Sequence, residues 1–312
     1  MPSTTPIFER LYQLFLSDTT RKHSEVAIIR VAIASFMVHL AIILMSTQGL
    51  FGLSIESSLF TNPISAIYTP FSFILIYEVY LLVYYLPKSI SRYIGKQYEI
   101  ITLILIRRIY YDLANLEFVE SWFSSKNDLQ FTYDIIGTLL LFVLILVFYR
   151  LNISRGITFD ENNLPPSVER FINIKKGIAT VLVPLFFILA ITNFYDWVST
   201  YFVAGSIEMA TIKELNKIFY DDFFTVLIMV DVFLLLISFM HTDEFSTVIR
   251  NSGYIISTIL IKLSFGIDGL LNTILTVAAV LFGVIILAIH IQYERRINLA
   301  PESSVLSQSS TP

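Results

Sequence analysis

The chain alternates between long apolar stretches and shorter polar connections over most of its length. Seven apolar stretches have the length and hydropathy that predict helices crossing a lipid bilayer. They are Val26–Thr47, Ile67–Leu86, Thr132–Tyr149, Gly177–Trp197, Phe223–Met240, Asn251–Gly266 and Leu270–Ile291. Apolar residues also recur at helical spacing between Ile7 and Phe15, which predicts a short helix lying on the inner membrane surface.

An eighth stretch, Gln97–Phe118, decides the topology of the whole chain. Arg107 and Arg108 interrupt its apolar residues at the centre, where an arginine costs roughly 2.5 to 3.5 kcal/mol. Its own hydropathy therefore fits either a helix that crosses the membrane or an amphipathic helix that lies in the interface.

The lysine and arginine residues of the connections favour a crossing. If Gln97–Phe118 crosses, fourteen of them fall on one side and three, Lys126, Lys213 and Lys217, on the other. If it does not cross, the basic connections around residues 88–96 and 150–176 fall on opposite sides, and the asymmetry disappears. Because basic residues concentrate in cytoplasmic connections, we predict eight transmembrane helices with both termini cytoplasmic.

The eight predicted helices form two similar groups of four. RVAIASFMVHLAIIL (Arg30–Leu44) aligns without gaps with KKGIATVLVPLFFIL (Lys175–Leu189), and IITLILIR (Ile100–Arg107) aligns with IISTILIK (Ile255–Lys262). Each group would enter and leave the membrane on the cytoplasmic side. We therefore predict two parallel four-helix repeats, an arrangement found in transporters and also in proteins that transport nothing.

The polar segments complete the predicted domain organisation. Tandem prolines, Pro165 and Pro166, mark a linker between the repeats because they cannot continue a helix. The C-terminal residues are small and polar, which is typical of disorder. The predicted parts are a cytoplasmic segment with the interfacial helix (1–25), the first repeat (26–150), a cytoplasmic linker (151–176), the second repeat (177–292) and a disordered cytoplasmic tail (293–312).

The composition of the 312-residue chain excludes several classes of protein. It is 55% hydrophobic with a mean hydropathy of +0.71, which is more apolar surface than a soluble domain buries. With 21 Lys+Arg against 25 Asp+Glu, it lacks the basic surface that nucleic acid requires. Zero cysteines exclude disulfides, thiolate metal sites and thiol nucleophiles. We predict an all-α integral membrane protein of a plasma or bacterial inner membrane.

Charged residues inside the predicted spans are the main candidates for a functional site. Glu78 and Asp231 lie near the middle of the second helix of each repeat, and Arg107 and Lys262 lie on the third helix. Unpaired ions at this depth are unfavourable, and such residues usually face the interior of the bundle and pair. We therefore predict that Arg107 pairs with Glu78 and that Lys262 pairs with Asp231.

The adjacent Arg108 has two predicted partners. Consecutive residues of a helix point about 100° apart, so Arg108 cannot face Glu78 as Arg107 does. It can bridge to Asp231 across the repeat interface or interact with Asp112, one turn along its own helix. Secondary candidates for the site are Arg30, His39, Asp112, Asp134 and Asp196.

No pattern in the sequence predicts a cofactor or a metal site. The chain has no HExxH motif, and its histidines show no recognised ligand spacing. His241 and His290 both lie at the inner ends of spans, where interfacial solvation accounts for them. A membrane-embedded enzyme is therefore the least favoured interpretation.

Two interpretations of the charges within the spans stay open. In the first, they line a path for an inorganic ion or small charged solute, and the protein is a channel or transporter. In the second, they lock the helices of a non-transporting subunit or scaffold, whose partner is a second copy or a membrane complex. Transport predicts a polar cavity that reaches Glu78, Arg107 or Asp231, whereas a scaffold predicts dry packing around them.

Overall fold

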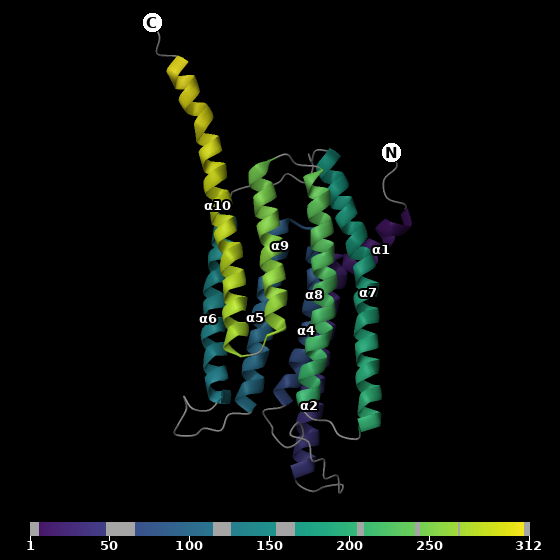
Figure 1. The fold of residues 1–312 in the computed structure, drawn as a ribbon. Coiled ribbons are helices and arrows are strands. Elements are labelled where there is room, and N and C mark those ends of the chain that lie inside the picture. Colours follow the sequence, from purple (N-terminus) through teal and green to yellow (C-terminus); the bar gives the residue numbers. More distant parts are fainter. Residues whose placement is uncertain are drawn as a thin grey trace.

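A computed structural model describes residues 6–47, 66–114, 126–153, 166–204, 209–240, 244–267 and 269–308, which form a bundle of long helices (Figure 1). No β-strand occurs in these ranges. The helices are α1 (Pro6–Leu16), α2 (Asp18–Thr47), α4 (Tyr68–Tyr85), α5 (Ile90–Ala114), α6 (Lys126–Ile153), α7 (Pro166–Ala204), α8 (Met209–Phe239), α9 (Phe245–Phe265) and α10 (Leu270–Gln308).

Helices that follow each other in the sequence also pack against each other. In the first half α2 contacts α4, α4 contacts α5 and α5 contacts α6, and α7, α8, α9 and α10 follow the same order in the second half. The halves meet mainly where α6 packs on α10, with smaller contacts between α5 and α9 and between α4 and α7. The C-terminal end of α10 and α1 lie toward the same end of the bundle (Figure 1). We call this the inner end, because the sequence predicts it to be cytoplasmic.

Within the described residues, five helical stretches are long and apolar enough to cross a membrane. They are Phe8–Ser46, Asp128–Ile153, Val168–Thr192, Asp222–Phe239 and Leu270–Arg296. Their outward faces carry large exposed hydrophobic side chains such as Met37, Phe142 and Phe187. Exposed apolar surface on this scale is typical of helices in contact with lipid. The chain thus has the several apolar helices of a polytopic membrane protein.

Each of the eight predicted spans lies largely within a helix, but three of these helices fall short of the length and apolarity needed to identify a span. The apolar part of α4 is short, covering Thr69–Tyr85. α5 contains Arg107 and Arg108, and α9 contains Lys262, so their apolar runs are interrupted. The number of crossings therefore stays a prediction.

Some helices extend into segments that the sequence assigned to a linker or a tail. α7 begins at Pro166 rather than at Gly177, which is consistent with the preference for proline in the first helical turn. α10 continues to Gln308, so most of the segment 293–312, expected to be disordered, is helical. Glu294 and the two arginines that follow it have high helix propensity, which favours this extension.

Two close contacts fix α10 against the first half of the chain. A methyl group in place of Gly137 on α6 would lie 2.2 Å from Thr273 Cγ2 on α10. A Cβ atom at Gly283 of α10 would lie 1.8 Å from the hydroxyl oxygen of Tyr98 on α5. Small residues allow transmembrane helices to approach this closely. The glycines therefore set the distances among α5, α6 and α10, which carry much of the polar chemistry of the bundle.

Candidate functional site

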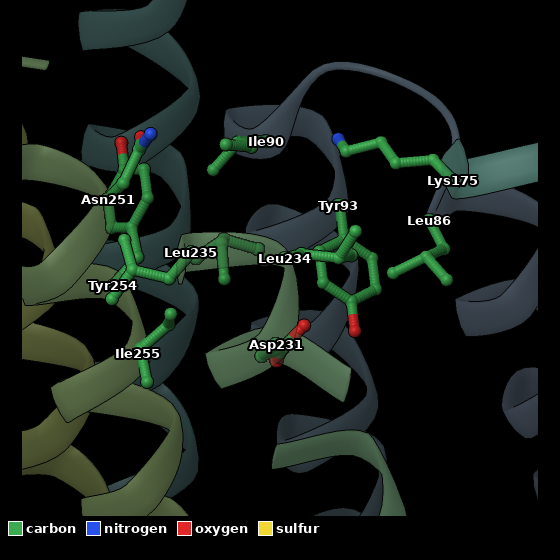
Figure 2. A pocket seen from close by; sticks show the side chains of 11 residues that line it. Leu86, Ile90, Tyr93, Lys175, Asp231, Leu234, Leu235, Asn251, Tyr254 and Ile255 are labelled. Carbon is green, nitrogen blue, oxygen red and sulfur yellow. The ribbon is translucent and has the colours of Figure 1, made fainter. Parts of the chain in front are cut away.

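A pocket lies between the two halves near the inner end of the bundle (Figure 2). Its lining comes from the inner parts of α4, α5, α7, α8 and α9 and is mostly apolar. The pocket has room for only a few water molecules. The charged members of its lining are Asp231 and Lys175. A pocket of this kind fits an ion or a very small polar solute better than a large substrate.

Asp231 on α8 lies at the lower side of the pocket in Figure 2 and is only 5% exposed. Its Oδ2 accepts a hydrogen bond from Gln97 Nε2 on α5 at 3.2 Å. Gln97 Oε1 in turn accepts one from Thr258 Oγ1 on α9 at 2.7 Å. Gln97 and Thr258 are fully buried. These bonds place the carboxylate at the contact between the two halves of the chain.

The hydroxyl of Tyr93 points from α5 toward the side of the pocket where Asp231 lies (Figure 2). Tyr93 is 4% exposed, and its hydroxyl lies close enough to Asp231 to interact with the carboxylate, although the geometry falls short of a hydrogen bond. Leaving a buried hydroxyl unsatisfied costs about 1 to 3 kcal/mol. A water molecule or a ligand beside Asp231 would satisfy it.

Lys175 on α7 supplies the second charge of the pocket. It is 4% exposed, and its Nζ donates a hydrogen bond to the backbone oxygen of Lys88 at 3.1 Å. Lys175 attracts the Asp231 carboxylate electrostatically, but no ion pair joins them among the described residues. The two opposite charges therefore lie apart, and the carboxylate is contacted by neutral groups.

A second polar cluster joins α5, α6 and α10 toward the outer end of the bundle. Arg108 forms an ion pair with Asp134, whose side chain is fully buried. The same guanidinium donates hydrogen bonds to Asn272 Oδ1 at 2.6 Å and to Thr273 Oγ1 at 2.9 Å. Gln130 Nε2 and Thr273 Oγ1 donate to Asp134 Oδ1 at 2.9 Å and 2.8 Å. Such a charge-assisted network holds three helices in one register.

Apolar side chains separate the inner pocket from this outer cluster. Ile101 and Leu105 lie on α5 between its inner polar residue, Gln97, and Arg108. Ile261 lies in the corresponding part of α9, about one turn beyond Thr258, which bonds Gln97. The three apolar side chains are each exposed by 2% or less. The two polar regions are therefore separated by a tightly packed, mainly apolar segment, in which the buried Thr102 hydroxyl donates to the backbone oxygen of Tyr98.

Lys262 and Asp231 do not form the predicted pair. Lys262 Nζ donates a hydrogen bond to Thr225 Oγ1 at 2.5 Å. Thr225 lies six residues before Asp231, which corresponds to about 9 Å along α8. The repeat alignment placed both charges on neighbouring helices, but it carried no information on their relative height.

Arg107 and Glu78 are separated as well. Glu78 on α4 is half-buried, and the charges that act on it include Lys96 and Glu99 of α5. Arg107 lies eight residues beyond Glu99, or about 12 Å further along the same helix. It is 4% exposed. The packing of α4 against α5 thus brings Glu78 to the inner part of α5 and not to its arginines.

Arg108 takes neither of its predicted partners. It pairs with Asp134 instead of Asp231 or Asp112, and Asp112 is buried near the outer end of α5. The sequence identified Asp134 as a secondary candidate but did not connect it with Arg108. Their contact depends on how α5 packs against α6, which no local pattern in the sequence encodes.

The remaining secondary candidates do not come together in one site. His39 Nδ1 lies 2.5 Å from Thr69 Oγ1, so it links α2 to α4. Arg30 is exposed on α2. The side chain of Asp196 lies outside the described residues, and so does His241.

The histidines and carboxylates within the described ranges form no group of three or more that could hold a metal ion. His290 is 2% exposed. Its Nε2 lies 3.0 Å from Arg250 Nη1 and 3.0 Å from Glu294 Oε1. His290 is therefore engaged in contacts between α9 and α10 and within α10.

Comparisons with known proteins supply no family for this chain. A scan against protein-family models, a search of the curated proteins and a search of the solved structures each found no match. The function must therefore be inferred from the chemistry of the two polar regions.

Sequence reasoning missed three residues that surround Asp231: Tyr93, Gln97 and Lys175. Tyr93 and Lys175 lay in segments assigned to cytoplasmic connections, and Gln97 was treated only as the first residue of a span. One signal was present, because the repeat alignment places Lys175 opposite Arg30. A cation near the start of the first helix of each repeat could therefore have been identified as a site candidate.

Proposed function

We propose that the protein transports a small cation, such as a proton or an alkali metal ion, with Asp231 as the group that binds it. The observation that supports this most directly is the pocket that reaches this buried carboxylate. A carboxylate contacted by neutral hydrogen-bonding groups retains a negative charge that a proton or cation would neutralise. The Tyr93 hydroxyl, which interacts with Asp231 without a hydrogen bond of good geometry, adds a second oxygen to the proposed site.

The position of the pocket is consistent with this proposal. Transporters built from repeats bind their substrates where the repeats meet, and the pocket is lined by α5 of the first half and by α8 and α9 of the second. Glu78 and Asp231 lie seven and eight residues before the ends of α4 and α8. Both are therefore about 10 to 12 Å from the inner ends of their helices. This matched height supports the proposed parallel repeat.

The proposed transport cycle begins with a site that faces inward. A cation reaches Asp231 from the inner end of the bundle, where the pocket lies. The packed segment around Ile101, Leu105 and Ile261 blocks its further passage in this conformation. Release on the outer side then requires the two halves to move relative to each other, as in alternating access.

The proposed topology has eight crossings, with both termini on the cytoplasmic side of a plasma or bacterial inner membrane. Because the chain has no cysteine, single cysteines can report the side on which each connection lies. We expect Ser89→Cys and Ser154→Cys to react with an impermeant thiol reagent from one side and Ser124→Cys from the other. Labelling of Ser89→Cys and Ser124→Cys from the same side would mean that α5 does not cross.

The transport proposal is tested by ion flux into proteoliposomes. Purified wild-type chain, Asp231→Asn and Glu78→Gln are reconstituted at equal density, and uptake of protons, Na⁺ and K⁺ is followed with ion-sensitive dyes. We expect flux of one of these ions in the wild type and its loss, by at least tenfold, in Asp231→Asn. Glu78→Gln is the matched control, since it removes a carboxylate that does not line the pocket.

Thermal unfolding in detergent shows whether each variant is folded. Flux that survives Asp231→Asn, or that is lost equally in folded Glu78→Gln, would contradict the assignment of Asp231. Absence of flux for all three ions in the wild type would contradict cation transport and favour the second candidate function.

That second function is a non-transporting membrane subunit or scaffold. The outer cluster favours it, because Arg108 and Asp134 are satisfied by hydrogen bonds from within the protein and do not line the inner pocket. Buried pairs of this kind can fix helix register without any role in transport. The inner pocket distinguishes the two functions, since a purely structural clamp requires no cavity beside Asp231.

A further inference from the structure

The helix α2 packs against the bundle mainly through α4, with a small contact to α1. Much of its remaining surface is exposed and apolar, including Ile33, Met37 and Val38. Arg30 is also exposed on this helix. An arginine on an otherwise apolar outer surface is unusual, because charged residues within membrane segments almost always face the interior of a bundle.

Arg30 lies inside α2, four residues or about 6 Å beyond Val26, where the predicted span begins. It lies about 18 Å along the helix from Asp18 and about 25 Å from Thr47, where the described part of α2 ends. Asp18 marks the inner end of the bundle, since it accepts a hydrogen bond from Tyr84 at the end of α4. Four apolar residues, from Val26 to Ile29, precede Arg30 directly. The guanidinium therefore lies beside apolar helix surface on both sides.

No hydrogen bond or ion pair of the Arg30 side chain is formed within the described ranges. An arginine costs about 2.5 to 3.5 kcal/mol at the centre of a membrane helix and less toward its ends, so the cost for Arg30, one turn inside the predicted span, lies below this range. An acidic partner at the same depth would reduce this cost. The charge of Arg30 thus favours a partner that places an acidic side chain against the outer face of α2.

The second half of the chain shows what happens to the equivalent cation. The alignment of Arg30–Leu44 with Lys175–Leu189 places Arg30 opposite Lys175. Lys175 is 4% exposed, and its helix α7 is contacted by α1 and α4 in addition to α8. The first helix of the second half is therefore covered by further helices, whereas α2 is not.

We propose that the outer face of α2 binds a transmembrane helix of a different membrane protein, and that this helix carries an aspartate or glutamate that pairs with Arg30. The face has the shape for close helix contact, because Ala27, Ala34 and Ala41 recur every seven residues on it and are exposed. Arg30 lies between the first two of these alanines. The carboxylate gives the partner its specificity, and the small residues allow the helix to approach.

A second copy of the chain does not fit this face. Symmetric dimers use the same surface on both copies, so two α2 helices related by a twofold axis along the membrane normal would bring Arg30 opposite its own equivalent at the same depth. Two like charges at close range in an apolar environment repel strongly. The nearest acid on this helix, Glu25, is five residues away and accepts a hydrogen bond from Tyr77 of its own chain at 3.3 Å.

A designed helix tests this proposal without knowledge of the natural partner. The probe is a synthetic leucine- and alanine-rich transmembrane peptide with one aspartate about one turn from its inner end, at the depth of Arg30, and the reference peptide has leucine there. Binding of each peptide to the full-length chain in liposomes is measured by energy transfer to a fluorophore. We expect the wild type to bind the aspartate peptide about tenfold more tightly than the leucine peptide, as expected for one polar contact between membrane helices.

The variant Arg30→Leu should abolish this preference, because it removes the only charge that the proposal uses. Arg92→Leu is the matched control: it removes an exposed arginine at the inner end of α5, and the preference should persist. Arg30→Asp should reverse the preference, so that a peptide with lysine at the same depth binds more tightly than the leucine peptide.

Three results would overturn the proposal. Equal binding of the aspartate and leucine peptides to the wild type would mean that lipid headgroups and water, rather than a helix, accommodate Arg30. An aspartate preference that persists in Arg30→Leu would place the contact elsewhere. Energy transfer between labelled copies of the chain that Arg30→Leu weakens would identify a second copy as the occupant. None of these results depends on whether the protein transports a cation.

Discussion

Replacing Asp134 with asparagine is expected to lower the free energy of unfolding by about 3 kcal/mol, close to the lower end of the range for breaking a buried ion pair. The substitution keeps the shape of the side chain but removes the negative charge that faces Arg108. The guanidinium then remains next to a fully buried position without its counter-charge. Denaturant titration in mixed micelles measures the change.

A matched control is available in another ion pair among the described residues. Lys96 and Glu99 lie 2.5 Å apart on α5, but their side chains are 21% and 32% exposed. Solvent screens such a pair, so Lys96→Met should cost less than about 1 kcal/mol. Similar losses in Lys96→Met and Asp134→Asn would contradict the role of the outer cluster as the main clamp between α5 and α6.

The substitution Gln97→Leu is expected to destabilise the protein by about 1 to 3 kcal/mol. Gln97 is fully buried and bonds both Asp231 on α8 and Thr258 on α9. Leucine has a similar volume but removes the bond to the Asp231 carboxylate, at a cost of about 1 to 3 kcal/mol, whereas the Thr258 hydroxyl can still donate to the backbone oxygen of Tyr254. The loss is measured by the same titration.

A double substitution separates the loss of these bonds from a change in packing. Removing both members of a buried hydrogen bond costs far less than removing one. Gln97→Leu combined with Asp231→Leu should therefore be more stable than the sum of the single losses predicts. Strict additivity of the two substitutions would contradict the direct bond between these side chains.

Much of the helical architecture could be predicted from the hydrophobic pattern. Each predicted span lies largely within a helix because apolar length is a strong local signal. The ends of the helices were less predictable: α7 begins earlier, at Pro166, and α10 continues to Gln308. Polar residues can extend a helix beyond the apolar run, and hydropathy does not distinguish such an extension from a loop.

The candidate site was only partly predictable, because charge inside an apolar run identifies a residue but not its partner. Asp231 and Arg108 were both found in this way. Their partners, Gln97 and Asp134, depend on how helices distant in sequence pack together, with a separation of 134 residues for Asp231 and Gln97. The sequence also offered only charged partners for Asp231, whereas the side chain that bonds it is a neutral amide.

The packed apolar segment between the two polar regions also affects how the protein would respond to voltage. Gln97 and Arg108, which bound this segment on α5, are about 16 Å apart along the helix, compared with about 30 Å for a whole bilayer core. An electrical potential falls mainly across dry, low-dielectric material, so most of the transmembrane field would be concentrated in this shorter distance. The electrical energy of a cation that leaves Asp231 and crosses this segment would then change by close to the full 2.3 kcal/mol per 100 mV in a single step. The sign of the membrane potential would thereby set the direction in which that step runs.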